Sequence, residues 1–229
     1  MHHIQRKVLG KLLYAESLAY SKIKPAGVES NHFAYHLEQL VKQGIVAKKD
    51  KQYFLAPQGL ALVDRMSQEK MVNRIQPHIL TVIEITNATG QTLLFKRAFQ
   101  PYIHKFGFPL GKTHLEETIE QAALRELEEK TGLTDIPLTQ RGFVYIHVKQ
   151  GGFTITKALC HVFSGRVEGS PGLPPATHRG SCHWEDVAAL PISYMMPGFL
   201  EIKHLLDTPQ EGLFFSEFLL EFNNDRAAK

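Results

Sequence analysis

Residues 111–133 carry the pattern that most restricts how this chain folds. Their sequence is GKTHLEETIEQAALRELEEKTGL. Thr118 is suited to cap a helix, and Gln121, three residues later, is suited to complete a capping box. Gly132 is the residue type that favours the left-handed backbone just past a helix end. We therefore expect a helix that begins just after Glu117 and stops at Gly132.

Two acidic side chains of this expected helix share one of its faces. Glu126, Glu129 and position 130 are three and four residues apart, the spacing at which helical side chains are neighbours. Two carboxylates beside a loop whose carbonyl groups point inward form an oxygen-rich site, which suits a hard divalent cation. A glutamate-rich helix is also typical of a solvated surface.

The same segment resembles the Nudix box, whose pattern is glycine, five residues, glutamate, seven residues, then Arg-Glu-apolar-x-Glu-Glu-x-Gly-apolar. The positions that match are Gly111, Glu117, Arg125, Glu126, Leu127, Glu129, Gly132 and Leu133. So many matches at fixed offsets argue against a merely solvated helix. The resemblance implies an α/β/α sandwich with a mixed sheet over residues 78–207, and hydrolysis of a nucleoside diphosphate derivative with Mg²⁺ or Mn²⁺.

The resemblance also implies a role for each site residue. The metal ligands would be the backbone carbonyl of Leu110 and the carboxylates of Glu126 and Glu129. Arg125 would join the two glutamates in catalysis. The groups that bind the ligand would be Gly111, Lys112 and Lys130.

Position 130 departs from the pattern, because lysine stands where the family places a metal-binding carboxylate. An ammonium about 4 Å from a divalent ion is repelled by about 8 kcal/mol at an effective dielectric of about 20, so we expect metal affinity to drop. Glu128 projects from a different face and does not replace the missing group. Lys130 is also able to contact a phosphate directly, which would retain binding without hydrolysis.

A second departure concerns the segment before Trp184. Family hydrolases commonly draw another acidic group from a loop at this point, but residues 169–183 contain no Asp or Glu. Glu168 and His183 are the remaining candidates for a base. Both departures favour ligand binding over hydrolysis.

The first third of the chain is basic. Residues 1–80 carry 12 Lys and Arg against 6 Asp and Glu, whereas residues 81–229 carry 14 against 17. A basic part beside a mildly acidic one indicates different partners, with nucleic acid the candidate for the basic part. Apolar spacing predicts helices over residues 4–14 and 29–43, a short segment at 18–23, a hairpin over 45–55 and a helix from Pro57.

This order of elements resembles the winged helix-turn-helix of ArsR-like and MarR-like bacterial regulators. The resemblance implies contacts with double-stranded DNA through the second helix of the turn motif and through the hairpin. The residues nominated for these contacts are Ser30, Asn31, His32, Tyr35, His36, Lys48, Lys49 and Lys51. Partial packing suits Tyr35 equally well, and the lysines are also typical of a solvated turn.

Metal binding by histidine or cysteine is a weaker expectation. His32 and His36 have the i, i+4 spacing of two metal ligands, but without a third ligand nearby an exposed helical pair is preferred. Cys160 and Cys182 are each followed by a histidine, yet they lack the usual spacing of zinc ligands. Two cysteines in the whole chain fit a reducing compartment.

We therefore expect an α+β protein with a winged helix over residues 1–70, a linker over 71–77, a Nudix domain over 78–207 and a tail over 208–229. The apolar segment 213–222 in the tail suits either a homodimer contact or packing on the Nudix core. No apolar run approaches the roughly 18 residues of a membrane span, and the N-terminus lacks a signal-peptide pattern. We expect a cytoplasmic protein without a membrane partner.

Two functions fit these expectations. The first is a transcriptional regulator that senses a nucleoside-diphosphate-linked metabolite with weak or absent hydrolysis. The second is an active Mg²⁺-dependent pyrophosphohydrolase of an ADP-ribose-like or other nucleotide, with the winged helix as an accessory domain. Lys130 favours the first function, and the retained box residues favour the second.

Overall fold

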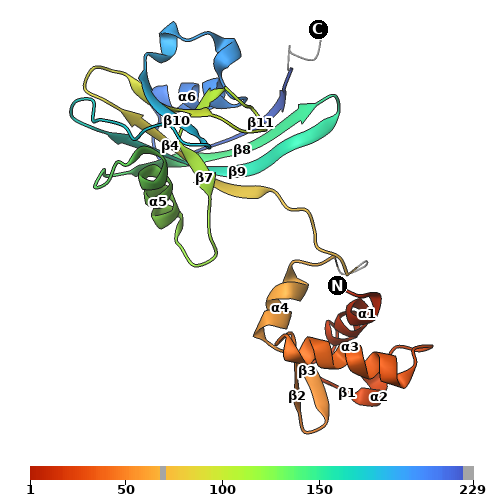
Figure 1. Cartoon of the computed structure of the whole chain (residues 1–229). Helices are drawn as coiled ribbons and strands as arrows, with labels where there is room; N and C mark the ends of the chain where they lie inside the picture. Colours follow the sequence, from red (N-terminus) through yellow and green to blue (C-terminus); the bar gives the residue numbers. More distant parts are fainter. Residues whose placement is uncertain (68–70, 224–229) are drawn as a thin grey trace. The chain divides into compact units, whose positions relative to one another are not determined.

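The computed structural model describes residues 1–67 and 71–223 (Figure 1). Contacts within the chain divide it into two compact units, Met1–Gln76 and Pro77–Lys229. The end of the expected winged helix, at residues 68–70, and the end of the expected tail, at residues 224–229, lie outside the described residues. Among the described residues, no helix is both long enough and apolar enough to span a membrane.

The first unit consists of short helices around a small sheet. Its helices are α1 (His3–Leu12), α2 (Tyr20–Ile23), α3 (Ser30–Lys42) and α4 (Pro57–Asp64). Its strands are β1 (Leu18–Ala19), β2 (Val46–Lys49) and β3 (Gln52–Leu55), in the antiparallel order β1-β3-β2. The long helices lie within two residues of the ranges that apolar spacing predicts.

The apolar stripes of α1 and α3 form the core of this unit. Val8 and Leu9 of α1 are fully buried, as are Phe33 and Leu40 of α3. The turn between β2 and β3 places the two residues at positions 50 and 51 in the left-handed region, with φ angles of 51° and 63°. Two successive residues of this kind give a turn whose twist matches that of the flanking strands.

The second unit is built on one mixed sheet. Its strands are β4 (His78–Thr86), β5 (Thr92–Arg97), β6 (Phe106–Gly107), β7 (Leu110–Lys112), β8 (Thr139–Gln150), β9 (Phe153–Arg166), β10 (Gly180–Glu185) and β11 (Phe214–Glu221). The main order is β10-β5-β4-β9-β8-β11, with β6 paired to β5 and β7 paired to β4. The pairs β4–β9 and β8–β11 are parallel and the others are antiparallel.

Helices cover both faces of this sheet, with α5 (Ile119–Thr131) on one side and α6 (Phe199–Asp207) on the other (Figure 1). Neighbouring residues of a strand point to opposite faces, so β4 serves two cores. Ile83 packs with Leu127 of α5, and Val82 packs with Phe199 of α6. Two 3₁₀ turns, Val187–Ala189 and Ile192–Tyr194, precede α6. The second unit therefore has the expected α/β/α sandwich with a mixed sheet.

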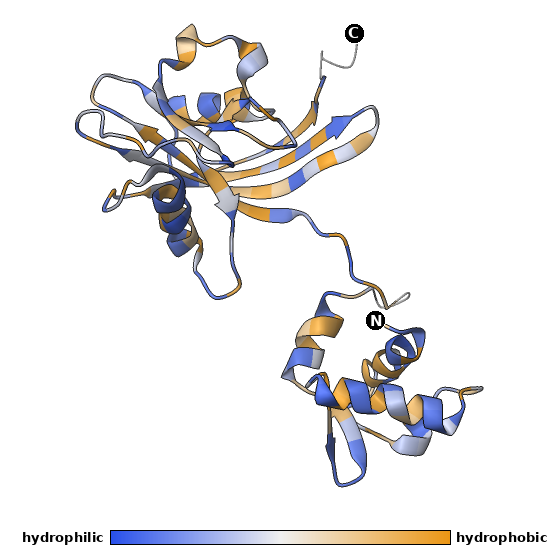
Figure 2. Ribbon diagram, in the orientation of Figure 1, coloured by the Kyte–Doolittle hydropathy of each residue, from blue (hydrophilic) through white to orange (hydrophobic). Residues whose placement is uncertain are grey.

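The hydropathy of the elements agrees with their positions (Figure 2). The central strands are largely apolar, whereas α5 is largely hydrophilic outside the stripe that faces the sheet. That stripe is narrow and includes Ala123 and Leu127, both almost fully buried. The remaining surface of α5 is free to carry charged side chains.

The segment after α6 folds back on the second unit. Strand β11 lies at the sheet edge, and its Phe214 is buried in the core that contains Phe199. The alternate residues Phe215 and Leu219 are exposed. The segment was expected either to contact a second copy of the chain or to pack on the Nudix core, and the described residues show that it packs on the core.

Candidate functional site

The loop before α5 is fixed to the helix by Arg125. Thr118 caps α5 with the expected capping box, since its hydroxyl accepts a hydrogen bond from the N–H of Gln121 and its own N–H donates to the Gln121 side chain. The Arg125 guanidinium donates to both carboxylate oxygens of Glu117, at 2.7 and 2.8 Å, and to the carbonyl oxygen of Lys112 at 3.1 Å. Hydrogen bonds from Arg125 lower the pKa of Glu117 from 4.5 to about 2.

The glycine at position 111 lets Glu126 lie directly against strand β7. A Cβ atom at Gly111 would lie 1.7 Å from the carboxyl carbon of Glu126 and within 2.0 Å of both its oxygens. Glu126 is only 6% exposed, and its Oε1 accepts a hydrogen bond from Arg125 at 3.0 Å. Any larger residue at position 111 would displace this buried carboxylate.

Lys130 forms an ion pair with the second oxygen of Glu126. The two residues are one helical turn apart, so the lysine side chain reaches the carboxylate without distortion of the helix. Both oxygens of Glu126 are therefore held by cations, Oε1 by Arg125 and Oε2 by Lys130. The sequence predicts repulsion between Lys130 and a metal ion, and the structure adds direct competition for the same carboxylate oxygen.

The donor set does not fit a tight Mg²⁺ or Mn²⁺ site. Glu126 is fully engaged, and the Glu129 side chain is 49% exposed with one oxygen 3.5 Å from Arg125. Over the described residues, the box carboxylates do not belong to any group of three His, Cys, Asp or Glu side chains whose ligand atoms lie within 4.8 Å of one another. Mg²⁺ requires near-octahedral oxygen coordination. Because Glu126 is paired with two cations, the metal-binding role expected for Leu110, Glu126 and Glu129 stays a prediction.

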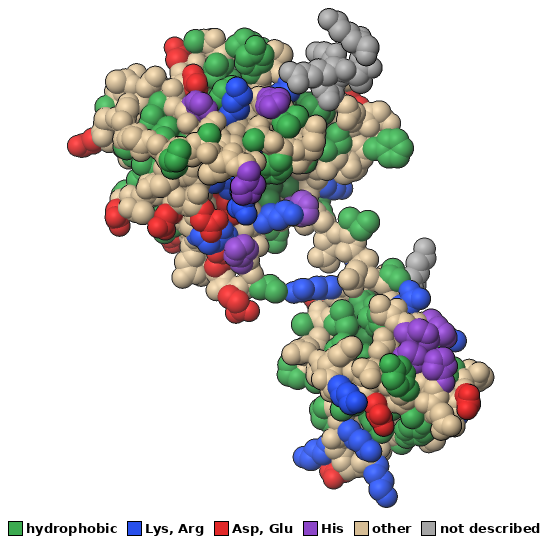
Figure 3. All heavy atoms as spheres, viewed as in Figure 1, with side chains coloured by type: hydrophobic (Ala, Val, Ile, Leu, Met, Phe, Trp, Pro, Cys, Tyr) green, Lys and Arg blue, Asp and Glu red, His purple; other side chains and the backbone are tan. Residues whose placement is uncertain are grey.

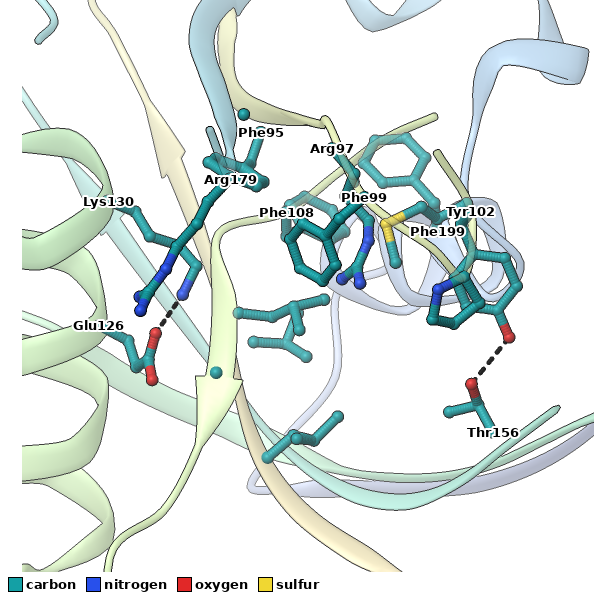
Figure 4. Close-up of a pocket in the computed structure, with 18 of the residues that line it drawn as sticks. Phe95, Arg97, Phe99, Tyr102, Phe108, Glu126, Lys130, Thr156, Arg179 and Phe199 are labelled. Carbon is teal, nitrogen blue, oxygen red and sulfur yellow. Dashed lines mark hydrogen bonds and ion pairs between the residues drawn. The ribbon is translucent and has the colours of Figure 1, made fainter. Parts of the chain in front are cut away.

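A cavity of about 820 Å³ lies beside α5 and β7 within the second unit (Figure 4). Its volume falls in the range of about 300–1,000 Å³ that is typical of small-molecule sites. The lining includes the expected residues Leu110, Gly111, Lys112, Glu126, Glu129 and Lys130. Arg125 does not line the cavity. We infer that it positions Glu117 and Glu126 and does not contact a ligand.

Two arginines that belong to no sequence motif also line this cavity. Arg97 ends β5, and Arg179 directly precedes β10. The Nε atom of Arg97 is buried without a hydrogen-bond partner in the described part of the chain, and its guanidinium lies 3.9 Å from the Phe99 ring centroid. Burial lowers the pKa of Arg97. In Figure 4, Arg179 extends toward the ion pair of Lys130 with Glu126.

The cavity has a second, aromatic part. Phe99, Tyr102, Phe108 and Phe199 line it. Tyr102 is 5% exposed, and its hydroxyl forms a hydrogen bond of 2.8 Å with Thr156. Aromatic walls pack well against flat rings. The whole cavity therefore suits a ligand with an anionic group at one end and a flat ring at the other.

The segment over residues 169–183, which includes the start of β10, supplies a cation to this cavity, and not the acid that family hydrolases commonly have there. Arg179 belongs to this segment, and the thiol of Cys182 on β10 donates to the carbonyl oxygen of Lys130 at 3.1 Å. Neither of the candidate bases, Glu168 and His183, lines the cavity. His183 lies instead 2.7 Å from the Ser181 hydroxyl.

The first unit exposes most of the residues nominated for DNA contacts. The exposed ones are Ser30, Asn31, His32, Tyr35, Lys48, Lys49 and Lys51. Figure 3 shows Lys and Arg side chains gathered at the end of this unit that the β2–β3 hairpin forms. His36 differs, because it is 8% exposed and stacks on His2 with 3.9 Å between ring centroids. The preferred interpretation of His32 and His36 as an exposed pair without a third histidine is therefore wrong.

Comparison with known proteins identifies the family. The chain matches the family model of the NUDIX domain over residues 77–204, more than half of its length, and it therefore belongs to the Nudix family. It is similar to the NUDIX domain of Shewanella oneidensis NrtR complexed with ADP ribose, at 16% identity over 58% of this chain and 88% of that chain, with a TM-score of 0.48. It is also similar to a NUDIX hydrolase from Nitrosomonas europaea, at 16% identity over 67% of this chain and 86% of that chain, with a TM-score of 0.48. A third similar structure is a mMutator MutT protein from Bacillus halodurans, at 22% identity over 62% of this chain and 89% of that chain, with a TM-score of 0.49. No curated protein matches the chain.

Proposed function

We propose that the Nudix domain binds a nucleoside diphosphate derivative with weak or absent hydrolysis. The observation that carries this proposal is the ion pair of Lys130 with Glu126, which occupies a box carboxylate and brings an ammonium group to the cavity wall. Lysine and arginine form strong charge-assisted hydrogen bonds with phosphate oxygens. Four such side chains line the cavity, and these are Arg97, Lys112, Lys130 and Arg179.

The shape of the cavity supports the nucleoside part of the proposal. The aromatic residues Phe99 and Tyr102 are positioned to pack against a base, while the cations around Lys130 receive the diphosphate. The unpartnered Nε of Arg97 offers a donor that a ligand oxygen would satisfy, because a buried polar group without a partner is unfavourable.

We further propose that the first unit is a winged helix-turn-helix that binds double-stranded DNA, which makes the protein a ligand-responsive transcriptional regulator. The support is the order of α3, hairpin and α4, together with exposed Asn31 and Tyr35 on α3 and exposed lysines at the hairpin turn. In such folds the recognition helix enters the major groove. Two copies of the chain suit a palindromic site, and exposed Phe215 and Leu219 on β11 offer an apolar strip for their contact.

An active Mg²⁺-dependent pyrophosphohydrolase is the second candidate function. The observation in its favour is that Glu129 is half exposed at the cavity while Glu117 and Arg125 keep their pairing. A metal-bound diphosphate would have to displace Lys130 from Glu126. The lysine side chain is flexible enough to move.

Binding and turnover of a ligand panel separate the two candidates. The panel contains ADP-ribose, dinucleotides and sugar nucleotides, and both titration calorimetry and release of nucleoside monophosphate are measured with and without Mg²⁺ or Mn²⁺. We expect the wild type to bind a panel member without metal and to release little product. Lys130→Glu should lose metal-free binding and gain Mg²⁺-dependent release, whereas Lys130→Gln should only lose affinity. Robust turnover by the wild type contradicts the sensor proposal.

The DNA-binding proposal is tested with gel shifts on genomic fragments, with and without the panel ligands. We expect binding that weakens as salt rises, because phosphate contacts release counterions. Absence of binding at low salt contradicts it.

A further inference from the structure

Three histidines from two helices of the first unit, one at the start of α1 and two on α3, meet on its surface. His2 directly precedes α1, and His32 and His36 lie one turn apart on α3. Their potential ligand atoms all lie within 4.8 Å of one another, and Figure 3 shows histidine side chains gathered in one patch on this unit. Within the part of the chain that the structure describes, this is the one group of three or more His, Cys, Asp or Glu residues that meets this distance.

We propose that His2, His32 and His36 form a binding site for Zn²⁺, with water in the fourth coordination position. Imidazole nitrogens bind zinc tetrahedrally at about 2.0–2.1 Å, which places two ligand nitrogens about 3.3 Å apart. The Nε2 atoms of His32 and His36 are already 3.1 Å apart. Two of the three ligand nitrogens are therefore already close to the separation that a tetrahedral ion needs, and zinc would replace the hydrogen bond between them.

The third ligand exchanges one hydrogen bond for the metal. Nδ1 of His2 accepts a hydrogen bond from the N–H of Ile4 at 3.3 Å, a long distance for such a bond. If zinc binds Nδ1, it replaces this bond directly. If zinc binds Nε2, the ring proton moves to Nδ1, which then no longer accepts. The second bond of the capping box, from the N–H of His2 to Gln5 at 3.1 Å, is retained in both cases.

Zinc binds the neutral form of each imidazole ring. Imidazole ligands favour zinc and other late transition metals, whereas carboxylate and carbonyl oxygens favour Mg²⁺. The histidine site is thus chemically distinct from the box, and its occupancy is independent of the function proposed for the second unit.

A metal ion at this position would connect two helices of the first unit. His2 forms the N-cap of α1, and His32 and His36 belong to α3, whose apolar side packs against α1. A ligand that binds only the folded state stabilises it by mass action. Zinc is therefore expected to raise the unfolding temperature of the first unit.

The test uses the full chain, with Zn²⁺ itself and Co²⁺ as probes. Equilibrium dialysis with elemental analysis should find one zinc ion per chain in the wild type and in His204→Gln, a control in an exposed position on α6. His32→Gln should weaken zinc binding by about 100-fold or more, since loss of even an outer-shell partner of a ligand costs about 10–100-fold. His32 is exposed, so this variant retains the fold.

Co²⁺ provides the second measurement. The wild type with Co²⁺ should show the intense visible absorption of a four-coordinate ion, and His2→Gln should lose it. Zinc should raise the unfolding temperature of the wild type and of His204→Gln but not of His32→Gln. Zinc affinity that is unchanged in both His2→Gln and His32→Gln overturns the proposal, as does a wild type that binds no zinc at one equivalent. In the latter case the cluster is only a hydrogen-bonded group of histidines.

Discussion

Helices α3 and α5 make an instructive pair, since each has 13 residues and each carries two site residues four positions apart. On α5 these are Glu126 and Lys130, which neutralise one another. On α3 they are His32 and His36, which His2 joins from outside the helix. The i, i+4 spacing thus supplies only a pair. A third residue joins each pair, Arg125 on α5 and His2 beside α3. The charge of the resulting group determines whether it suits an anion or a cation.

The two helices also differ in how charge is compensated. On α5, Arg125 and Lys130 hold both oxygens of Glu126. The cavity beside α5 is therefore suited to bind an anion. The cluster on α3 consists of imidazoles, which present lone pairs when neutral and so have capacity for a cation. We therefore expect the helix with the family's metal motif to be the poorer metal site of the two.

The largest effect is expected from Gly111→Ala, which breaks the α5 half of the comparison. The added methyl group would overlap the Glu126 carboxylate. Displacement of a buried and paired charge should cost about 3 kcal/mol or more in the free energy of unfolding of the Nudix domain. Urea unfolding measures this loss. Gly172→Ala is the matched control, because a Cβ there meets no atom within 4 Å, and an equal loss in both variants would refute the explanation.

Lys130→Glu should have the next largest effect. It restores the glutamate that the family pattern has at this position of α5. Loss of the ion pair with Glu126 should lower metal-free stability by about 2 kcal/mol, since bonds to charged groups contribute about 1.5–3 kcal/mol. Mg²⁺ should then raise the unfolding temperature of this variant but not that of the wild type. Lys130→Met, which removes the cation without adding an acid, should lose stability without a response to Mg²⁺; a Mg²⁺ response in Lys130→Met would count against this account.

A smaller effect concerns the pH dependence of the Glu117–Arg125 pair. Because Arg125 lowers the pKa of Glu117 to about 2, the carboxylate should remain ionised well below its usual 4.5. The folded state then binds fewer protons than the unfolded state, so the stabilisation is complete above about pH 4.5 and is lost as pH falls through about 2. Carbon-13 NMR of the Glu117 carboxyl measures the titration. A midpoint near 4.5 in the wild type would show that Arg125 does not hold Glu117.

The smallest effect should follow from Lys49→Gln. This variant tests whether the hairpin lysines bind DNA phosphates, in contrast to Arg125 and Lys130 of α5, which pair with Glu126. Lys49 is exposed and forms no ion pair within the described residues. If it contacts a phosphate, its loss should reduce the slope of log affinity against log salt by about 0.9. Fluorescence anisotropy with labelled DNA measures the slope. Lys7→Gln, exposed on α1, should leave it unchanged, and equal effects would indicate general electrostatic attraction.

The features that residue spacing predicts correctly are the local ones. The capping box of Thr118 and Gln121, the end of α5 at Gly132 and the neighbouring positions of Glu126 and Lys130 all follow from spacing within one helix. These features depend on hydrogen bonds between residues a few positions apart.

The remaining site residues are brought together by contacts between distant parts of the chain, which the spacing of residues in the sequence does not predict. Arg97 and Arg179 reach one cavity because β10 pairs with β5 in register. His2 meets His36 because α1 packs on α3. In each case the two partners are far apart in the chain, and only the packed fold brings them together. The ion pair of Lys130 with Glu126 was accessible in principle, since it is an i, i+4 pair of opposite charge.

The edge strand β11 has a practical consequence for work on the isolated Nudix domain. Strand β11 begins after residue 204, where the family match ends. All of its residues pair with β8, and its Phe214 is buried. A truncation at that boundary would uncover the backbone ladder of β8 and leave a hole in the core beneath it. Unpaired strand edges recruit other chains, so such a fragment should aggregate, and an expression boundary after residue 223 preserves the protective strand.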